Sequence, residues 1–388
     1  MRYVLYALLG ILILGLVFFF VIFPRQFDAN ANGVIEQDFP EPSAEARALH
    51  AQLTIVDLHC DLLLWKRNPN ERADRGHVDF PRMRAGNHAA QAFTIVSKVP
   101  ASLITGKPSW RWDIITILGV SELWPPRTWT SLRERALYQA GKMHDFVAQA
   151  ADSVILLKAS GDVDEFIAAR TAGIPLLAGW IGVEGMQVLE GDLGNVDVLF
   201  DAGIRMMAPT HFLNTELGGS AHDDPSVGLT EFGRQVIARM EEKGMLLDLA
   251  HASPRLIDDA LSVVTRPVVV SHTGVKGTCD NERNVSDAHL QRIAATGGVI
   301  GVAFFKTATC GTDVDAIVRA IDHTVSVAGI DHVALGSDFD GAVSVPFDAS
   351  GMIYLTDGLL RAGYSHDDIK KIMGGNALRV LREVLPQQ

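Results

Sequence analysis

Acidic and histidine side chains recur where the apolar runs of this chain end. The runs are rich in β-forming residues, as in LTIVDL, PLLAGWIGV and PVVVS. The side chains that close these runs are His59, Asp61, Glu184, His211, His251, His272 and Asp338. Strands that end repeatedly in potential metal ligands predict a parallel barrel whose chemistry lies at the carboxyl ends of its strands. This pattern indicates a two-metal hydrolase.

The alternation of strands and helices favours an α/β fold, a (β/α)8 barrel of the TIM type. The strands that we predict are 53–58, 90–96, 175–183, 204–210, 245–250, 267–271, 298–304 and 332–337. Residues 99–172 are longer than one crossover requires, and we interpret them as a helical insertion. An open doubly wound sheet is the alternative, but we find no glycine-rich phosphate motif to support it.

The N-terminal segment is apolar enough to cross a membrane. Residues 3–23 are 21 consecutive residues without a charge. At about 1.5 Å per residue, such a helix would span a hydrocarbon core of about 30 Å. A cleaved signal peptide is the alternative, because Ala29-Asn30-Ala31 resembles a small-x-small cleavage site. Either interpretation exports the domain.

We divide the chain into three parts. Residues 1–25 are the predicted transmembrane helix (or signal peptide), 26–44 a flexible stalk rich in Asn, Asp and Pro, and 45–388 the metal-dependent barrel. Arg2 precedes the apolar span, and this charge bias favours a single-pass protein with its catalytic domain on the extracytoplasmic side.

Composition limits the partners of the domain. The formal net charge is −12 and no run is rich in Lys or Arg, which argues against a nucleic-acid partner.

Cys279 and Cys310 could pair in an oxidising compartment, but the sequence leaves their separation open. Cys60 lies between two proposed ligands, so its side chain points to the opposite face of the strand, where we expect it to be buried.

The proposed ligands form two pairs and one bridge. His59 and Asp61 are two residues apart, so both project to one face of a strand and can share a cation. His251 and His272 are separated by the length of one strand-to-strand step. A carboxylate such as Glu184 can bridge metals about 3.5–4 Å apart. Imidazole suits zinc, and open positions on two zinc ions would hold a water that ionises to hydroxide near neutral pH.

Two further strand ends suggest substrate chemistry. His211 is not needed for the ligand set, and we place it against the substrate carbonyl oxygen or the developing oxyanion. Asp338 lies beside the predicted metals and could shuttle a proton from water to the leaving amine. Asp340 fits a helix cap better. We assign no function to the remaining histidines, which are His50, His77, His88, His144, His222, His289, His323, His332 and His366.

These residues resemble a known family, the membrane (renal-type) dipeptidases, which are zinc peptidases of the amidohydrolase-like barrel group. The resemblance runs from about residue 50 to 382 through VDLHCD, HVDFPRMRAG, GVEG, THFLNT, GLTEFGRQVI, LLDLAHAS, VVVSHTG, RNVSD, GSDFDG and GGNALRV. It implies His59 and Asp61 on one zinc, His251 and His272 on the other, and Glu184 as the bridge. It also implies substrate contacts from His211, Arg283 and Asp338.

Arg283 enters through the resemblance alone, since it lies in the loop DNERNVSD and ends no strand. A guanidinium there would clamp a free carboxylate through two parallel hydrogen bonds, which selects dipeptides. The family also implies tolerance of a D-residue at the C-terminal position. The chain departs from the family in its long 99–172 region, with Trp110, Trp112 and Trp124, and in its apolar N-terminal span.

Our leading hypothesis is a membrane-anchored dizinc dipeptidase that attacks the peptide carbonyl with a metal-bound hydroxide. A two-metal hydrolase of another amide, a lactone or an ester is the first alternative, because barrel loops set specificity independently of the metals. The second alternative is a non-catalytic barrel that acts as a binding protein, for which a lost ligand would be the expected signature. Dipeptides are the expected substrates, and a homodimer remains an open expectation.

Overall fold

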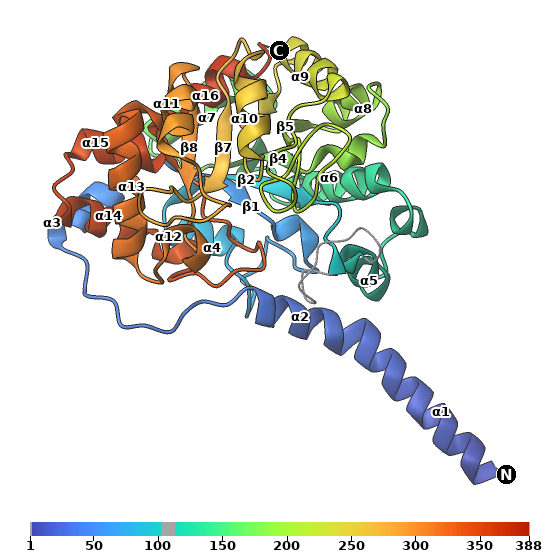
Figure 1. The fold of residues 1–388 in the computed structure, drawn as a ribbon. Helices are drawn as coiled ribbons and strands as arrows, with labels where there is room; N and C mark the ends of the chain where they lie inside the picture. The colour runs from blue at the N-terminus through green and yellow to red at the C-terminus, as the bar shows by residue number, and fades with distance from the viewer. Residues whose placement is uncertain (1, 102–112, 388) are drawn as a thin grey trace.

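A curled parallel sheet forms the centre of the molecule (Figure 1). The structure is a computed structural model that describes residues 2–101 and 113–387. Its main strands are β1 Ile55–Cys60, β2 His88–Val96, β4 Leu177–Glu184, β5 Ile204–Ala208, β6 Leu246–Leu247, β7 Val269–Thr273, β8 Val299–Val302 and β9 Val333–Leu335. The strand order is β6-β5-β4-β2-β1-β9-β8-β7. Asp248 and Val269 form a parallel bridge between the two ends of this path, and the predicted (β/α)8 barrel is confirmed.

Helices alternate with most of the strands along the chain and cover the outside of the sheet (Figure 1). They are α3 Ala44–His50, α4 Phe80–Ala85, α5 Ile114–Ser121, α6 Leu132–Gln149, α7 Ser160–Thr171, α8 Asn195–Asp201, α9 Glu231–Lys243, α10 Pro254–Leu261, α11 Asp287–Ala295, α12 Lys306–Thr309, α13 Val314–Ala328, α14 Met352–Arg361, α15 His366–Lys370 and α16 Asn376–Val384. Many begin at a residue whose side chain accepts a hydrogen bond from a backbone N–H of the first turn. Examples are Asp79, Ser131, Thr230, Ser253 and Ser286.

Short 3₁₀ and π turns complete the chain at the ends of strands and helices. They are η2 Leu62–Leu64, η4 Pro126–Trp129, η5 Met186–Leu189, η6 Ile330–His332, η7 Ala349–Gly351 and η8 Lys371–Gly375.

The region 99–172 holds one strand that we did not predict. β3, Val154–Leu156, pairs in parallel with β4 outside the main strand order. Its three residues are too few to show a strand period in the sequence. Trp110 and Trp112 lie outside the described residues, whereas Trp124 is buried.

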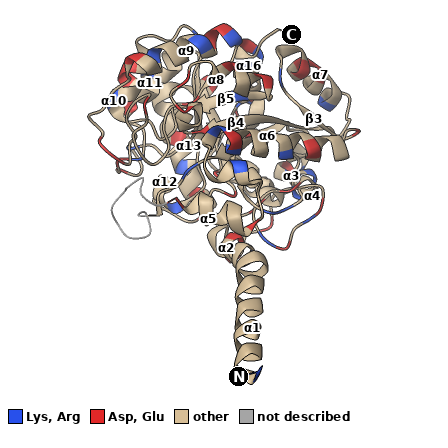
Figure 2. Ribbon diagram, turned by 90° about the vertical axis from the view of Figure 1, so that its right-hand side faces the viewer, with Lys and Arg blue, Asp and Glu red and all other residues tan. Residues whose placement is uncertain are grey.

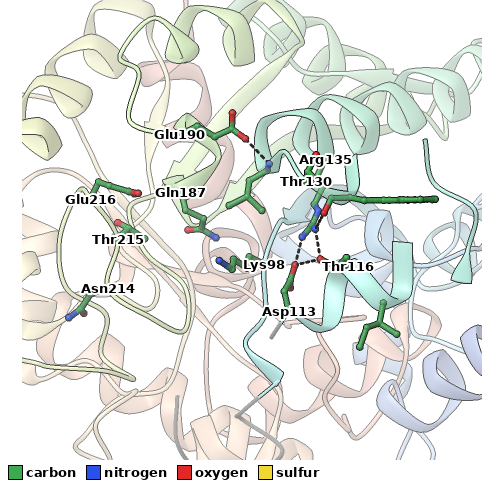
Figure 3. Close-up of a pocket in the computed structure, with 13 residues that line it drawn as sticks. Lys98, Asp113, Thr116, Thr130, Arg135, Gln187, Glu190, Asn214, Thr215 and Glu216 are labelled. Atoms are coloured by element: carbon green, nitrogen blue, oxygen red, sulfur yellow. Dashed lines mark hydrogen bonds and ion pairs between the residues drawn. The ribbon is translucent and has the colours of Figure 1, made fainter. Parts of the chain in front are cut away.

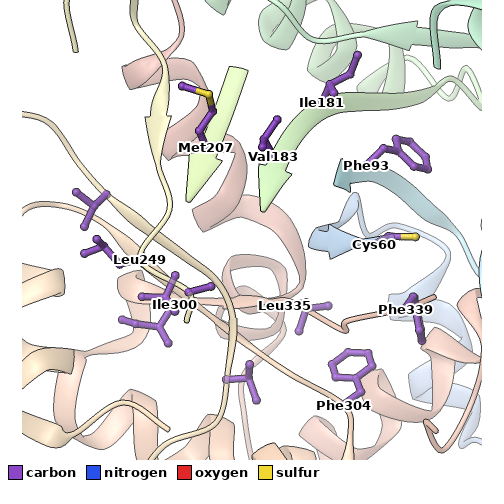
Figure 4. Close-up of a cluster of buried hydrophobic side chains, with 14 of the residues drawn as sticks. Cys60, Phe93, Ile181, Val183, Met207, Leu249, Ile300, Phe304, Leu335 and Phe339 are labelled. Atoms are coloured by element: carbon purple, nitrogen blue, oxygen red, sulfur yellow. The ribbon is translucent and has the colours of Figure 1, made fainter. Parts of the chain in front are cut away.

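The core is built by side chains from several strands that meet between sheet and helices (Figure 4). Phe93 of β2 and Ile181 of β4 are fully buried there. Phe304 and Phe339, just beyond β8 and β9, pack edge to face with ring centroids 5.7 Å apart. Cys60 is fully buried, as predicted.

The N-terminal helix extends away from the domain (Figures 1 and 2). It comprises α1 Arg2–Val17, the π segment η1 Phe18–Ile22 and α2 Phe23–Ala31. Its most apolar window has a mean hydropathy of 2.9, and none of that window is buried. By length and composition the helix is able to cross a membrane, a property that signal sequences share.

The segment expected to be a flexible stalk is docked on the domain at its first part. Asp28 is buried, and its Oδ2 lies 3.1 Å from Arg67 Nε and 2.7 Å from Arg75 Nε. Asn32 is also buried, and its Oδ1 accepts a hydrogen bond from the Ala342 backbone N–H at 2.9 Å. These long-range polar contacts order residues that look like a linker by composition.

Asp340 does not cap a helix, which corrects our expectation. Its side chain is fully buried. Oδ1 accepts a hydrogen bond from the His77 backbone N–H at 2.7 Å and lies 2.8 Å from Arg67 Nη2. Since Arg67 also binds Asp28, the end of the N-terminal helix is linked to the loop that follows β9.

Candidate metal centre

All of the predicted site residues meet at the carboxyl ends of the strands. They surround or adjoin a cavity of about 500 Å³. Their positions are His59 and Asp61 at the end of β1, Glu184 at the end of β4, His211 after β5, His251 after β6, His272 in β7, Arg283 in the loop after β7, and Asp338 after β9. This common position follows from parallel strands, whose carboxyl ends face the same side of a barrel.

Glu184 lies at the centre of this group. Its Oε1 is 2.7 Å from His251 Nε2, 3.5 Å from His272 Nε2 and 3.8 Å from His59 Nε2. Oε2 is 3.1 Å from His211 Nε2. Oε1 is buried and has no hydrogen-bond donor among the described residues. Buried polar atoms are rarely left without a partner, so an oxygen in this position fits a metal ligand.

His59 and Asp61 form the first predicted pair of ligands. The distance from His59 Nε2 to Asp61 Oδ1 is 3.5 Å, although Asp61 lies one residue beyond β1. Thr94 Oγ1 donates to Asp61 Oδ1 at 2.6 Å, and Ser271 Oγ lies 3.1 Å from His59 Nδ1. These neighbours orient the two side chains while leaving His59 Nε2 directed at the carboxylates.

His251 and His272 form the second pair. Their Nε2 atoms lie only 2.9 Å apart, which places both lone pairs beside Glu184 Oε1. His211 and Asp338, predicted as substrate contacts, also lie within ligand distance: His211 groups with Glu184 and His251, and Asp338 groups with the first pair. The residues present therefore offer enough N and O donors for two cations.

Two carboxyl groups of the site, those of Glu184 and Asp338, hold their protons tightly. Burial raises the pKa of Glu184 well above its ordinary value, and the charge of Asp61 raises it further. Burial also raises the pKa of Asp338 to about 8, although His59 opposes this shift. Cations bound between these groups would favour the ionised carboxylates, because opposite charge lowers a carboxyl pKa.

The imidazoles of the second pair are neutral. Burial lowers the pKa of His251 and of His272 well below the ordinary value, and the Arg283 charge adds to both shifts. Neutral imidazole is the form that binds metals. For His59, burial also favours the neutral ring, but Asp61 and the neighbouring carboxylates raise its pKa to about 10.

Two of the site residues have a backbone that is unusual for residues other than glycine. His251 and Asp338 both have φ of 62°. Such left-handed conformations cost free energy in side-chain-bearing residues and cluster at functional sites. Each residue lies a few positions beyond the end of its strand, and its side chain lines the cavity.

The loop that carries Arg283 is fixed to the barrel. Arg283 is buried, and its Nη2 donates to the His272 carbonyl oxygen at 2.7 Å. The adjacent Asn284 donates through Nδ2 to the Cys279 carbonyl oxygen at 2.7 Å. Cys279 and Cys310 form a disulfide, which decides the pairing that the sequence left open. The guanidinium is thereby held in the wall of the cavity.

A known protein family matches most of this chain. The family model described as membrane dipeptidase (peptidase family M19) matches residues 43–387. The chain belongs to the membrane dipeptidase family. It is therefore a metallopeptidase, and the resemblance inferred from the motifs is confirmed.

Individual relatives and solved structures are also similar to this chain over most of its length. Dipeptidase AclJ of Aspergillus oryzae is 28% identical over 354 residues, which are 86% of this chain and 78% of that protein. A structure of the probable dipeptidase PvdM from Pseudomonas aeruginosa has a TM-score of 0.74 at 21% identity, covering 89% of this chain and 98% of the other. A metallopeptidase from Rhodobacter sphaeroides, liganded with a phosphinate mimic of the dipeptide L-Ala-D-Ala, has a TM-score of 0.72 at 24% identity, covering 86% and 99%.

His222 is a site residue of this membrane dipeptidase that our sequence reasoning missed. Its Nε2 lies 2.9 Å from His251 Nδ1, and its ring lines the same cavity. Burial lowers the pKa of His222 to about 3, and the Arg283 charge adds to that shift. A neutral His222 can accept a hydrogen bond from His251 Nδ1–H, which leaves His251 Nε2 as the metal-binding atom. Its position in the loop after His211, at the same end of the barrel, is the feature of the sequence that could have pointed to it.

We expect His222→Ala to weaken the affinity for a divalent metal ion, with zinc as the probe, roughly ten- to hundred-fold, the usual cost of removing the partner of a ligating imidazole. Competition with a chromophoric chelator measures this affinity directly. His366→Ala is the matched control, because His366 is an exposed histidine bound to Glu45, remote from the site. Equal zinc affinities in the His222→Ala variant and this control would contradict the role of His222.

Proposed function

We propose that this chain is a two-zinc dipeptidase, anchored in a membrane by its N-terminal helix, whose barrel hydrolyses dipeptides on the exported side. The observation that supports it most is the position of Glu184, whose Oε1 faces His59, His251 and His272 at 2.7–3.8 Å without a hydrogen-bond donor among the described residues. Arg283 in the same cavity adds the group that would recognise a free carboxylate.

The donor set fits two zinc ions. We assign His59 and Asp61 to one zinc, His251 and His272 to the other, and Glu184 to both. When bound, the two ions would polarise the peptide carbonyl and activate water. Oxygen and imidazole donors of this kind suit zinc and similar divalent ions.

The remaining side chains would bind the dipeptide and move its proton. Arg283 would hold the terminal carboxylate, which sets the length of the substrate at one residue beyond the scissile bond. His211 would donate to the carbonyl oxygen as negative charge develops there; burial lowers the pKa of His211 well below its ordinary value, so the ring is a neutral donor. Asp338 would carry a proton to the nitrogen of the leaving amine.

We extend the proposed substrates to dipeptides with a D-residue at the C-terminal position. The Rhodobacter sphaeroides metallopeptidase was solved with a phosphinate mimic of L-Ala-D-Ala, and this chain aligns with nearly all of that structure. The cavity, about 500 Å³, lies within the usual range of about 300–1,000 Å³ for small-molecule sites.

Membrane anchoring and export are supported by three observations. The helix has 21 uncharged residues in succession, and the disulfide between Cys279 and Cys310 suits an oxidising compartment. Cleavage at Ala31 would also remove Asp28, the carboxylate that pairs with Arg67 and with a second arginine of the domain. The retained helix therefore agrees with the folded domain better than a cleaved signal peptide.

Turnover of a substrate panel by the full chain, purified in detergent, tests the proposed function. We expect elemental analysis to give two zinc ions per chain. We expect hydrolysis of L-Ala-L-Ala and L-Ala-D-Ala. In tri-alanine we expect little hydrolysis of the first peptide bond, because the carboxylate lies two residues beyond that bond, too far to reach Arg283. Chelation should abolish activity and added zinc should restore it. One zinc per chain, or hydrolysis confined to esters or lactones, would overturn the proposal.

A further inference from the structure

An exposed apolar patch lies at α5, and we call Ile117, Leu123 and Trp129 the α5 patch. Their relative exposures are 45%, 66% and 37%. Ile117 and Trp129 line one groove of about 900 Å³, and Leu123 lies in the turn that ends α5. Leu123 has φ of 62°, a costly conformation for a leucine that also faces solvent. Two unfavourable features at one residue indicate a surface with a partner.

The position of α5 is fixed by the domain. Asp113 caps its N-terminus by accepting from the Ile115 backbone N–H at 3.1 Å. Arg135 of α6 pairs with Asp113 and donates through Nη2 to Thr116 Oγ1 at 2.6 Å (Figure 3). These bonds hold the helix so that Ile117 remains at the surface.

α5 also lies beside the N-terminal helix. It packs against η1 and α2, as Figures 1 and 2 both show. Ile115 and Leu118 of α5 belong to one apolar cluster with Phe27 and Ala31 of α2. Because η1 is part of the uncharged stretch 3–23, α5 lies at the level where this stretch meets the polar domain.

The same cluster reaches the catalytic cavity. Leu64 and Val96 pack in it and also line the cavity. The link from Asp28 through Arg67 to Asp340 joins the helix to the loop after β9 as well. The carboxyl ends of the strands therefore face the side from which the N-terminal helix leaves.

We propose that the α5 patch rests in the interface of the lipid bilayer beside the anchor, so that the barrel mouth is seated against the membrane surface. This inference rests on the anchoring proposed above and adds a second contact to it. Exposed Trp and aliphatic side chains suit the boundary between headgroups and acyl chains. The chain carries a net charge of −12, so anionic lipid would not attract it. The proposed contact depends on apolar side chains and should therefore form on zwitterionic lipid.

Spin labels on the full chain in phosphatidylcholine nanodiscs test this contact. Labels enter at Ile117→Cys and Leu123→Cys, with Cys60 buried and the other cysteines in their disulfide. Ile174→Cys is the matched control, because Ile174 is 54% exposed and precedes β4 at the opposite end of the barrel. We expect several-fold lower accessibility to a water-soluble paramagnetic chelate at 117 and 123 than at 174, together with higher accessibility to oxygen.

A label at Leu12→Cys tests the N-terminal anchor separately from the α5 contact. Water-exposed labels at 117 and 123 with a lipid-embedded label at 12 would overturn the α5 contact and leave the anchor intact. A water-exposed label at 12 would overturn the anchor and the contact together. Shielding of 117 and 123 that persists in detergent, with spin coupling between chains, would show that a second copy covers the patch and would also overturn the lipid contact.

Discussion

Replacing Arg283 by alanine is expected to lower kcat/KM for dipeptides by about thirty-fold to several thousand-fold. The guanidinium is buried in the cavity wall, and truncating one partner of a buried charged pair costs about 2–5 kcal/mol. A substrate that lacks the free carboxylate cannot make this contact. A dipeptide amidated at its C-terminus should therefore be a poor substrate of the unaltered enzyme and lose far less in Arg283→Ala.

Two further measurements distinguish loss of the carboxylate contact from loss of metal. Zinc content should be unchanged, because Arg283 is outside the proposed ligand set although its Nη2 lies 3.5 Å from His251 Nε2. Arg283→Lys should recover part of the lost kcat/KM, since it restores the charge without the two parallel hydrogen bonds. If Arg283→Ala reduced kcat/KM equally for free and amidated dipeptides, the carboxylate clamp would be refuted and a generic two-metal hydrolase would remain.

Most of the barrel could be predicted because its strands are buried on both faces and appear as continuous apolar runs. The predicted run 245–250 is longer than the observed β6, Leu246–Leu247, because hydrophobicity persists where backbone pairing ends. β3 escaped prediction because three residues carry no measurable period. The docking of residues 26–35 was equally hidden, since the pairing of Asp28 with Arg67 depends on the folded chain.

Some residues of the candidate site could likewise be predicted from the sequence, and others could not. His59, Glu184, His251 and His272 could be found because parallel strands bring their carboxyl ends together. Arg283 lies in a loop, where no period constrains position, and only the family resemblance pointed to it. The contact of His222 with His251 depends on how the loop after β5 folds back, which composition does not reveal.

Asp338→Asn is expected to reduce kcat by about 10²–10⁴-fold, the usual contribution of a positioned proton-transfer group. Asparagine has the size of aspartate and tolerates positive φ, so the backbone at φ 62° should persist. The loss should be similar for free and amidated dipeptides, since the leaving amine needs a proton in both. Zinc content should again be unchanged, which separates this variant from loss of a ligand.

The pH profile gives the sharpest test of the role of Asp338. Burial raises the pKa of Asp338 to about 8, and bound cations would lower it, so the carboxylate ionises below that pH in the loaded enzyme. A base must be ionised to accept a proton, so kcat should rise with pH through this pKa. In Asp338→Asn, kcat should be lower, and the rise of kcat with pH on the acidic side of the profile (the acidic limb) should disappear. An unchanged limb in the variant would assign it to another group, and an unchanged kcat would exclude Asp338 from proton transfer.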